Sequence, residues 1–228
     1  NVESEDGNNV YLTIDETIQS SCEKYMQKGV EDNNVLNKGV CIAMDVNTGA
    51  ILAMVTTDGY DLNNPYELSA KDKKKIKSTA KSKQAEAESA ALSNMWRNKA
   101  VADTYMPGSV FKMCIASAAL EENLVNDKTS FTCTGSIEVE GETIHCSNIS
   151  GHGTQSFVEA ISNSCNPAFV QIGQMLGASK FRQYYQGFGF SDKTGIDLPG
   201  EAEDSFWKEG KMGGVDLAVA SFGQNFSI

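Results

Sequence analysis

Residues 103–119, DTYMPGSVFKMCIASAA, decide how the chain is organised. Pro107 and Gly108 break the chain, and the apolar residues after them recur at helical spacing, which predicts a helix. Ser109 and Lys112 stand three residues apart at its start, and residues at that spacing share one helix face. The helix N-terminus would stabilise an oxyanion, and a partly desolvated lysine can accept the serine proton. The functional interpretation is therefore a serine nucleophile with a lysine base, and the alternative is a capping serine beside a surface lysine.

Upstream of this stretch, the sequence predicts a helix over 14–28 followed by a β-hairpin over 39–57. Thr13–Glu16 has the pattern of a capping box, and apolar residues follow it at helical spacing. Val40, Ile42, Met44 and Val46 alternate along one strand, and Asn47-Thr48-Gly49 forms the turn. A helix followed by a hairpin indicates an α+β fold rather than a βαβ repeat.

Downstream, short helices and a second hairpin are expected. Residues 136–146 read as a hairpin that turns at Gly141, and the periodic segments suit helices. Asn166 is a suitable N-cap, and Pro167 suits the first helical position. The expected helices cover residues 156–163, 166–176 up to Gly177, 179–186 and 213–222.

The charge distribution excludes one class of function. The chain of 228 residues has a net charge of −11, which argues against generic binding to nucleic acid backbones. Seven Lys and one Asp between Lys71 and Lys83 give a local charge of +6. Residues 58–104 show no clear apolar period before Trp96, so they are predicted to be an irregular segment with some surface helix. The Lys-rich part, at about 62–95, is interpreted as a surface insertion without a catalytic role.

A second element that can carry chemistry is Ser164-Cys165-Asn166, an S-x-N tripeptide between two expected helices. In serine acyl-transfer sites, such a serine relays a proton and such an asparagine binds the peptide carbonyl of the substrate. Its structural alternative is that Asn166 only caps the next helix.

The two elements together resemble the signature of penicillin-binding proteins and active-site serine β-lactamases, S-x-x-K followed by S-x-N. The surrounding sequence resembles the class B penicillin-binding proteins. Four segments match motifs of that family. Residues 10–15 match its xLTID opening, and residues 43–54 match its D-x-x-T-G-x-I-L-A hairpin. Residues 103–112 match its PGSxFK segment, and residues 195–201 match its TGIDLPGE segment.

This resemblance runs from about residue 10 to 225 and implies a peptidoglycan transpeptidase fold of class α+β. Its antiparallel sheet is flanked by helices, and residues 1–228 form a partial transpeptidase domain that lacks the C-terminal part. Lys193-Thr194-Gly195 spells K-T-G but lies in the TGIDLPGE segment, so it is not the active-site K-T-G of the family. Without that later motif, the 228-residue chain is expected to be inactive.

The resemblance also implies the activity and its setting. A serine D,D-transpeptidase cross-links peptidoglycan stem peptides through an acyl-enzyme and is inhibited by β-lactams. Ser109 is the expected nucleophile, Lys112 the base, Ser164 the relay and Asn166 the substrate contact. A membrane glycosyltransferase partner and a location at the extracytoplasmic face of the cell membrane are implied as well. The alternatives are a class D-like β-lactamase, a β-lactam sensor domain and a docking protein with a vestigial site.

The last constellation consists of Cys133, Cys146, His152 and Cys165. Three thiolates and one imidazole within 33 residues suit a tetrahedral Zn²⁺ ion. Some elongation-type class B proteins are similar in carrying zinc in this region, which implies a structural Zn²⁺ here and no organic cofactor. A Cys133–Cys146 disulfide and unconnected thiols are the alternatives, and His145 is the competing imidazole.

Overall fold

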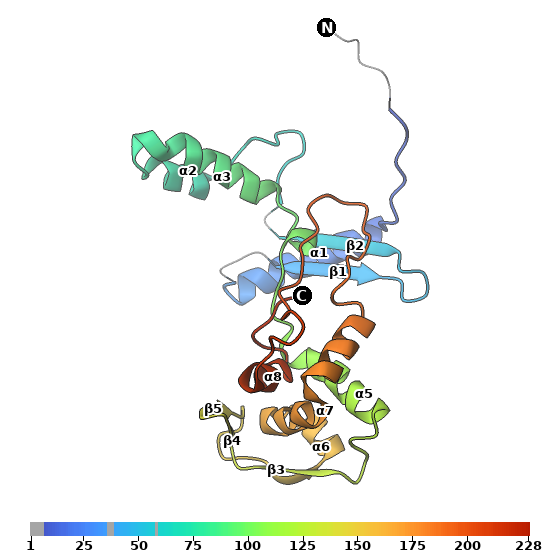
Figure 1. Cartoon of the computed structure of the whole chain (residues 1–228). Coiled ribbons are helices and arrows are strands. Elements are labelled where there is room, and N and C mark those ends of the chain that lie inside the picture. The colour runs from blue at the N-terminus through green and yellow to red at the C-terminus, as the bar shows by residue number, and fades with distance from the viewer. Residues whose placement is uncertain (1–6, 36–38, 58) are drawn as a thin grey trace. The chain divides into compact units, whose positions relative to one another are not determined.

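The computed structural model describes residues 7–35, 39–57 and 59–228. The chain divides into two compact units, residues 1–103 and residues 104–228, and Figure 1 shows the elements of each. Within the described ranges, no helix combines the length and the apolar content needed to cross a membrane.

The first unit contains the expected helix and hairpin. Helix α1 spans Glu16–Asp32, and strands β1 (Val40–Met44) and β2 (Ile51–Thr56) pair antiparallel. The helix packs along β2, where the Gln19 side chain accepts from the Met54 N–H at 2.8 Å and donates to its carbonyl at 3.2 Å. The N-cap is Asp15 and not Thr13, because the Thr13 hydroxyl donates to the Ile51 carbonyl at 2.6 Å. Both elements therefore form as predicted, with a different cap.

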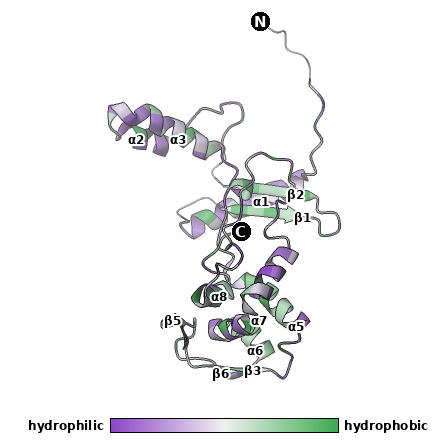
Figure 2. Cartoon of the chain, in the orientation of Figure 1, coloured by the Kyte–Doolittle hydropathy of each residue, from purple (hydrophilic) through white to green (hydrophobic). Residues whose placement is uncertain are grey.

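The apolar row of β1 does not face the buried side of the hairpin. Val40, Ile42 and Met44 are 38–54% exposed, whereas Ala53 and Val55 of β2 are buried. Cys41 and Ala43 stand opposite Val55 and Ala53, so these four share the buried face. Figure 2 shows hydrophobic residues along both strands, which explains why the alternation in β1 alone did not identify the covered face.

Residues 59–103 are more helical than their sequence predicted. They form α2 (Ala70–Lys77), the 3₁₀ turn η1 (Lys81–Lys83), α3 (Gln84–Trp96) and α4 (Lys99–Ala102). The base of the α2–α3 hairpin is closed by Trp96, whose indole N–H donates to the Pro65 carbonyl at 2.6 Å. In the described part of the chain, only Lys73 of the lysine run has an acidic partner, Glu67 at 3.2 Å. The lysines of the run are thus exposed on α2 and on η1.

The second unit is an assembly of helices and short strands. Its elements are η2 (Gly108–Phe111), α5 (Lys112–Glu121), β3 (Ser130–Cys133), β4 (Ser136–Val139), β5 (Glu142–His145), β6 (Gly153–Ser156), α6 (Phe157–Ser162), α7 (Asn166–Gly187) and α8 (Gly214–Ala220). The expected hairpin is β4–β5, and the two-residue turn at Glu140 and Gly141 has positive φ at both positions, as a type I′ turn requires. Pairing of β3 with β6 was not predicted.

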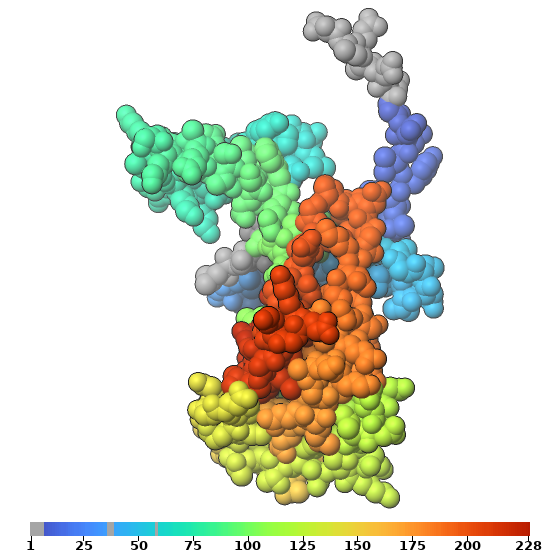
Figure 3. Space-filling view, viewed as in Figure 1, coloured from blue at the N-terminus to red at the C-terminus, as the bar shows by residue number. Residues whose placement is uncertain are grey.

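The core of this unit lies between α5, α7 and α8. Phe111, Phe181, Tyr185, Phe206 and Phe226 form a cluster of aromatic rings with centroids 3.9–6.3 Å apart in the contacting pairs. Helix α7 is interrupted where predicted, since Gly177 has φ 74°. In the space-filling view, the orange atoms of α7 lie against the yellow atoms of residues 130–156 (Figure 3). The S-x-N tripeptide at the start of α7 lies close to α5, because Lys112 of α5 donates hydrogen bonds to Ser164 and Asn166.

Candidate active site

Ser109 lies on a short 3₁₀ turn immediately before α5. The turn spans Gly108–Phe111, and the Lys112 N–H donates to the Ser109 carbonyl. Residues three apart on a 3₁₀ turn eclipse one another, so Ser109 and Lys112 leave the backbone on the same side. Ser109 is exposed, and its hydroxyl makes no hydrogen bond within the described residues. The buried ring of Phe111 anchors the turn in the aromatic cluster.

The chain segment before Ser109 is held by residues at the C-terminal end of the sequence. The Gly108 N–H donates to the Gly223 carbonyl at 2.8 Å, and Tyr105 and Ile228 exchange two backbone hydrogen bonds. A Cβ atom at Gly223, which has φ 81°, would lie 2.0 Å from the Gly108 carbonyl oxygen. Gly223 is therefore required by this close approach, and the segment Ser221-Phe222-Gly223-Gln224 holds the turn that carries Ser109.

Lys112 is a buried lysine at the centre of the site. It is 2% exposed, and its Nζ donates to the Ser164 carbonyl at 2.7 Å, the Ser164 Oγ at 3.0 Å and the Asn166 Oδ1 at 2.8 Å. Burial lowers the pKa of Lys112 to about 8, although Cys165 and Cys146 act to raise it. The pKa of Lys112 is thus close to the value that suits a general base at neutral pH.

The S-x-N tripeptide turns sharply between α6 and α7. Ser164 has φ 48°, a left-handed conformation that is uncommon for a residue other than glycine. The N-cap of α7 is Cys165, so Asn166 is already helical and does not cap the helix as expected from the sequence. Its side chain instead accepts from Lys112 and donates through Nδ2 to the His145 carbonyl at 3.2 Å. The geometry therefore brings Lys112, Ser164 and Asn166 together.

The four predicted metal ligands gather in one place. The ligand atoms of Cys133, Cys146, His152 and Cys165 all lie within 4.8 Å of one another. The three cysteines are buried and free, and the Cys146 Sγ lies 3.5 Å from the His152 Nδ1. His145 is exposed and lies outside this cluster. A tetrahedral Zn²⁺ with Zn–S near 2.3 Å needs sulfurs about 3.8 Å apart, so the cluster fits zinc after slight contraction.

Burial, side chains and N–H groups around Cys133 and Cys165 together shift the pKa values of these two thiols in opposite directions. Burial raises the pKa of Cys133, but the backbone N–H groups of Gly135 and His152, with the His152 and Cys165 side chains, outweigh it and lower the pKa to about 7. Burial raises the pKa of Cys165 to about 12, against the Ala168 N–H and the Gln155 amide. Backbone N–H groups thus already donate toward the Cys133 and Cys165 sulfurs, and such donors favour the thiolate form that binds a metal.

Lys193-Thr194-Gly195 takes no part in this site. The Thr194 N–H and hydroxyl donate to the Glu201 carboxylate at 2.7 and 2.6 Å, and Lys193 is exposed 3.8 Å from Glu203. These contacts close a local surface turn. They agree with the interpretation that this K-T-G is not the catalytic one.

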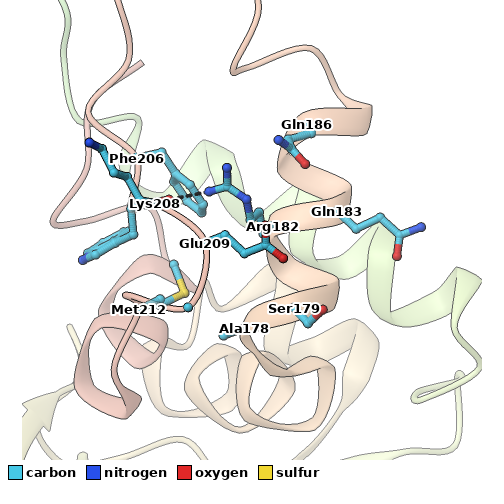
Figure 4. A pocket seen from close by; sticks show the side chains of 11 residues that line it. Ala178, Ser179, Arg182, Gln183, Gln186, Phe206, Lys208, Glu209 and Met212 are labelled. Atoms are coloured by element: carbon cyan, nitrogen blue, oxygen red, sulfur yellow. Dashed lines mark hydrogen bonds between the residues drawn. The ribbon is translucent and has the colours of Figure 1, made fainter.

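A cavity of about 580 Å³ lies elsewhere in the second unit, between the second half of α7 and residues 206–212. Figure 4 shows Arg182 reaching across it, where the guanidinium donates to the Trp207 carbonyl. Its lining contains neither Ser109 nor Lys112 nor any member of the cysteine cluster. This cavity is therefore separate from the group of residues around Lys112.

The turn that carries Ser109, the buried lysine and the S-x-N tripeptide are arranged as serine acyl transfer would require. The family model of the penicillin binding protein transpeptidase domain matches residues 39–228, and the chain belongs to this family. The α+β transpeptidase fold predicted from the sequence is confirmed.

Several relatives support this membership. The chain is 34% identical over 224 residues to stage V sporulation protein D of Bacillus subtilis, covering 98% of the chain and 31% of the relative. It is 32% identical over 188 residues to the peptidoglycan D,D-transpeptidase PbpA of Mycobacterium tuberculosis, covering 80% of the chain and 36% of the relative. The chain thus spans about a third of the length of these relatives.

Solved structures agree with the fold. The ceftriaxone acyl-enzyme complex of penicillin-binding protein A from M. tuberculosis superposes with a TM-score of 0.74 at 28% identity, covering 95% of this chain and 47% of that one. Penicillin-binding protein 3 from the same organism, in complex with aztreonam, gives a TM-score of 0.75 at 24% identity, covering 95% and 43%.

Proposed function

We propose that this chain carries the nucleophile, base and relay of a serine D,D-transpeptidase that cross-links peptidoglycan stem peptides. The observation that carries the proposal is the buried Lys112 Nζ. Lys112 follows Ser109 by one 3₁₀ turn, and its Nζ lies within 3.0 Å of both the Ser164 Oγ and the Asn166 Oδ1. Relatives named as peptidoglycan D,D-transpeptidases favour this activity over a β-lactamase or a sensor.

The residues divide the reaction between them. Neutral Lys112 takes the Ser109 hydroxyl proton while the Ser109 Oγ bonds to the carbonyl carbon of the penultimate D-Ala. The proton then passes through Ser164 to the amide nitrogen of the terminal D-Ala, the C–N bond breaks, and D-Ala leaves. An amine of a second stem peptide then bonds to the ester carbonyl carbon, the bond from this carbon to the Ser109 Oγ breaks, and the amine proton passes through Lys112 to the departing Oγ, which restores the Ser109 hydroxyl and neutral Lys112. The Asn166 amide binds the peptide carbonyl of the substrate, and a β-lactam acylates Ser109 through its strained amide.

We further propose a structural Zn²⁺ held by Cys133, Cys146, His152 and Cys165. The support is the chemistry of the donor set, since three buried thiols and one imidazole lie within 4.8 Å of one another. Four protein ligands close the coordination shell, so such an ion stabilises the fold and offers no open position for substrate.

The cellular setting is also a proposal. Cross-linking takes place where glycan strands are polymerised, at the extracytoplasmic face of the cell membrane. The partner that this chemistry needs is a membrane glycosyltransferase that supplies the strands.

The nucleophile is tested in the full-length protein that contains this chain. A fluorescent penicillin should label Ser109 covalently, and Ser109→Ala should abolish the label. Ser117→Ala is a matched control, because Ser117 is exposed on α5 and donates only to the Met113 carbonyl. An adduct that peptide mapping places on another residue would refute the assignment.

A further inference from the structure

Gln155 is a buried glutamine whose amide is only half satisfied. It lies on β6 opposite Phe131 and is 3% exposed. Its Oε1 accepts a hydrogen bond from the Asn163 Nδ2 at 3.0 Å. Its Nε2 has no hydrogen-bond partner, and in the described part of the chain it is the single buried side-chain nitrogen or oxygen atom in this condition. Buried polar groups are nearly always paired, so this nitrogen needs an explanation.

The neighbouring group toward which the Gln155 amide can donate is the thiol of Cys165. The Nε2 stands beside this buried sulfur without completing a hydrogen bond to it. A neutral thiol is a weak acceptor, whereas a metal-bound thiolate is an ionised acceptor to which N–H groups bond strongly. The unpaired Nε2 therefore gains a good partner when Cys165 ligates a metal.

The two contacts of Gln155 lie on either side of Ser164 in the sequence. Asn163 precedes Ser164 and Cys165 follows it, and Ser164 between them has φ 48°. A left-handed non-glycine residue persists only where its surroundings hold it. The carbonyl and hydroxyl of this residue both accept from Lys112, so its backbone conformation sets where Lys112 lies.

We propose that Gln155 is a positioning residue that clamps Ser164 by bonding Asn163 through its Oε1 and the metal-bound Cys165 sulfur through its Nε2. The clamp joins the metal centre to the proton-relay serine without touching substrate. This inference rests on the metal proposed above. A side chain that served only to fill the core would not need both a donor and an acceptor here.

Two substitutions separate the two ends of the amide. Gln155→Glu keeps an acceptor for Asn163 but places an oxygen instead of an N–H group against the sulfur. Gln155→Leu removes both contacts and keeps an apolar side chain of similar size. Gln183→Glu is the control, since Gln183 is an exposed glutamine on α7 that lines the separate cavity.

The experiment measures the zinc-loaded full-length protein in three ways: the rate of zinc release to a chromophoric chelator, the thiolate-to-metal absorption of the Co²⁺-substituted protein, and the rate of acylation by a fluorescent penicillin. Substituting a hydrogen-bond partner of a metal ligand typically lowers the affinity for the metal by about 10–100-fold. Both Gln155 variants should release zinc faster by about that factor, shift the Co²⁺ band and acylate more slowly, while Gln183→Glu behaves as wild type.

Three results would overturn the proposal: a wild-type protein that holds no zinc, Gln155 variants that release zinc at the wild-type rate, or a Gln155→Glu variant indistinguishable from wild type. These results are separable from failure of the proposed function, which would be a wild-type protein that a penicillin does not label at Ser109.

Discussion

The buried position of Lys112 predicts how acylation depends on pH. Its pKa lies at about 8, below the ordinary value of about 10.4, and burial is the main cause. With a pKa of 8, about a tenth of Lys112 is neutral at pH 7. The neutral fraction of a lysine with the ordinary pKa would be about 200-fold smaller. The environment of the site therefore favours the neutral form by about 3 kcal/mol.

The measurement is the second-order rate of acylation by a fluorescent penicillin between pH 6 and 10. With neutral Lys112 as the proposed base, the rate should rise about 90-fold from pH 6 to 9 and level off above the pKa. Lys112→Met should lower the rate by about 10²–10⁴ and remove this rise. Lys128→Met, at an exposed lysine of the same unit, should keep the wild-type profile.

The opposite outcomes would refute the reasoning. A midpoint near pH 10 would mean that burial does not lower the pKa of the working lysine. A Lys112→Met variant that retains the rise would mean that another group accepts the proton.

Two further predictions concern parts of the chain outside the proton relay. Full-length protein purified without chelator should contain about one zinc per chain, and removing it should lower both the melting temperature and the acylation rate. A Cys133–Cys146 disulfide detected by mass spectrometry would contradict this. Replacing residues 70–95 with a short Gly/Ser linker should change acylation less than tenfold, or about 1.4 kcal/mol in the barrier. A larger loss would show that the Lys-rich helical hairpin positions something in the site.

The sequence was sufficient for the elements that local patterns define. The helix before the first hairpin, the turn at Gly141 and the break at Gly177 all follow from spacing and from residues that tolerate positive φ. The S-x-x-K and S-x-N elements were found as short motifs, which need no long-range information. The same is true of the cysteine and histidine ligand set, whose residue types suggest a metal wherever they gather.

Features that depend on distant contacts were not predictable. Strands β3 and β6 pair across a complete intervening hairpin, and β6 (Gly153–Ser156) is a polar tetrapeptide without alternation. Lys112 was expected to reach Ser109, but its Nζ donates to Ser164 and Asn166, which lie 52 and 54 positions later in the sequence. The role of Gln155 could not be predicted from the sequence, because a glutamine in a polar stretch is expected at the surface, whereas the fold buries this one.

The position of Cys165 explains how a closed metal site could affect catalysis at a distance. Cys165 is fully buried in the ligand cluster, while its neighbours Ser164 and Asn166 both turn toward Lys112. Cys165 is thus a ligand of the proposed metal centre, and the residues on either side of it belong to the proposed proton relay. A Cα–Cα step is only about 3.8 Å, so a sulfur held by four-coordinate zinc restricts the Ser164 hydroxyl through very few bonds. Displacements of about 1 Å in such a relay can cost about 10²-fold in rate. The proposed metal would therefore influence acylation through the geometry of the residue beside its ligand Cys165, without meeting substrate.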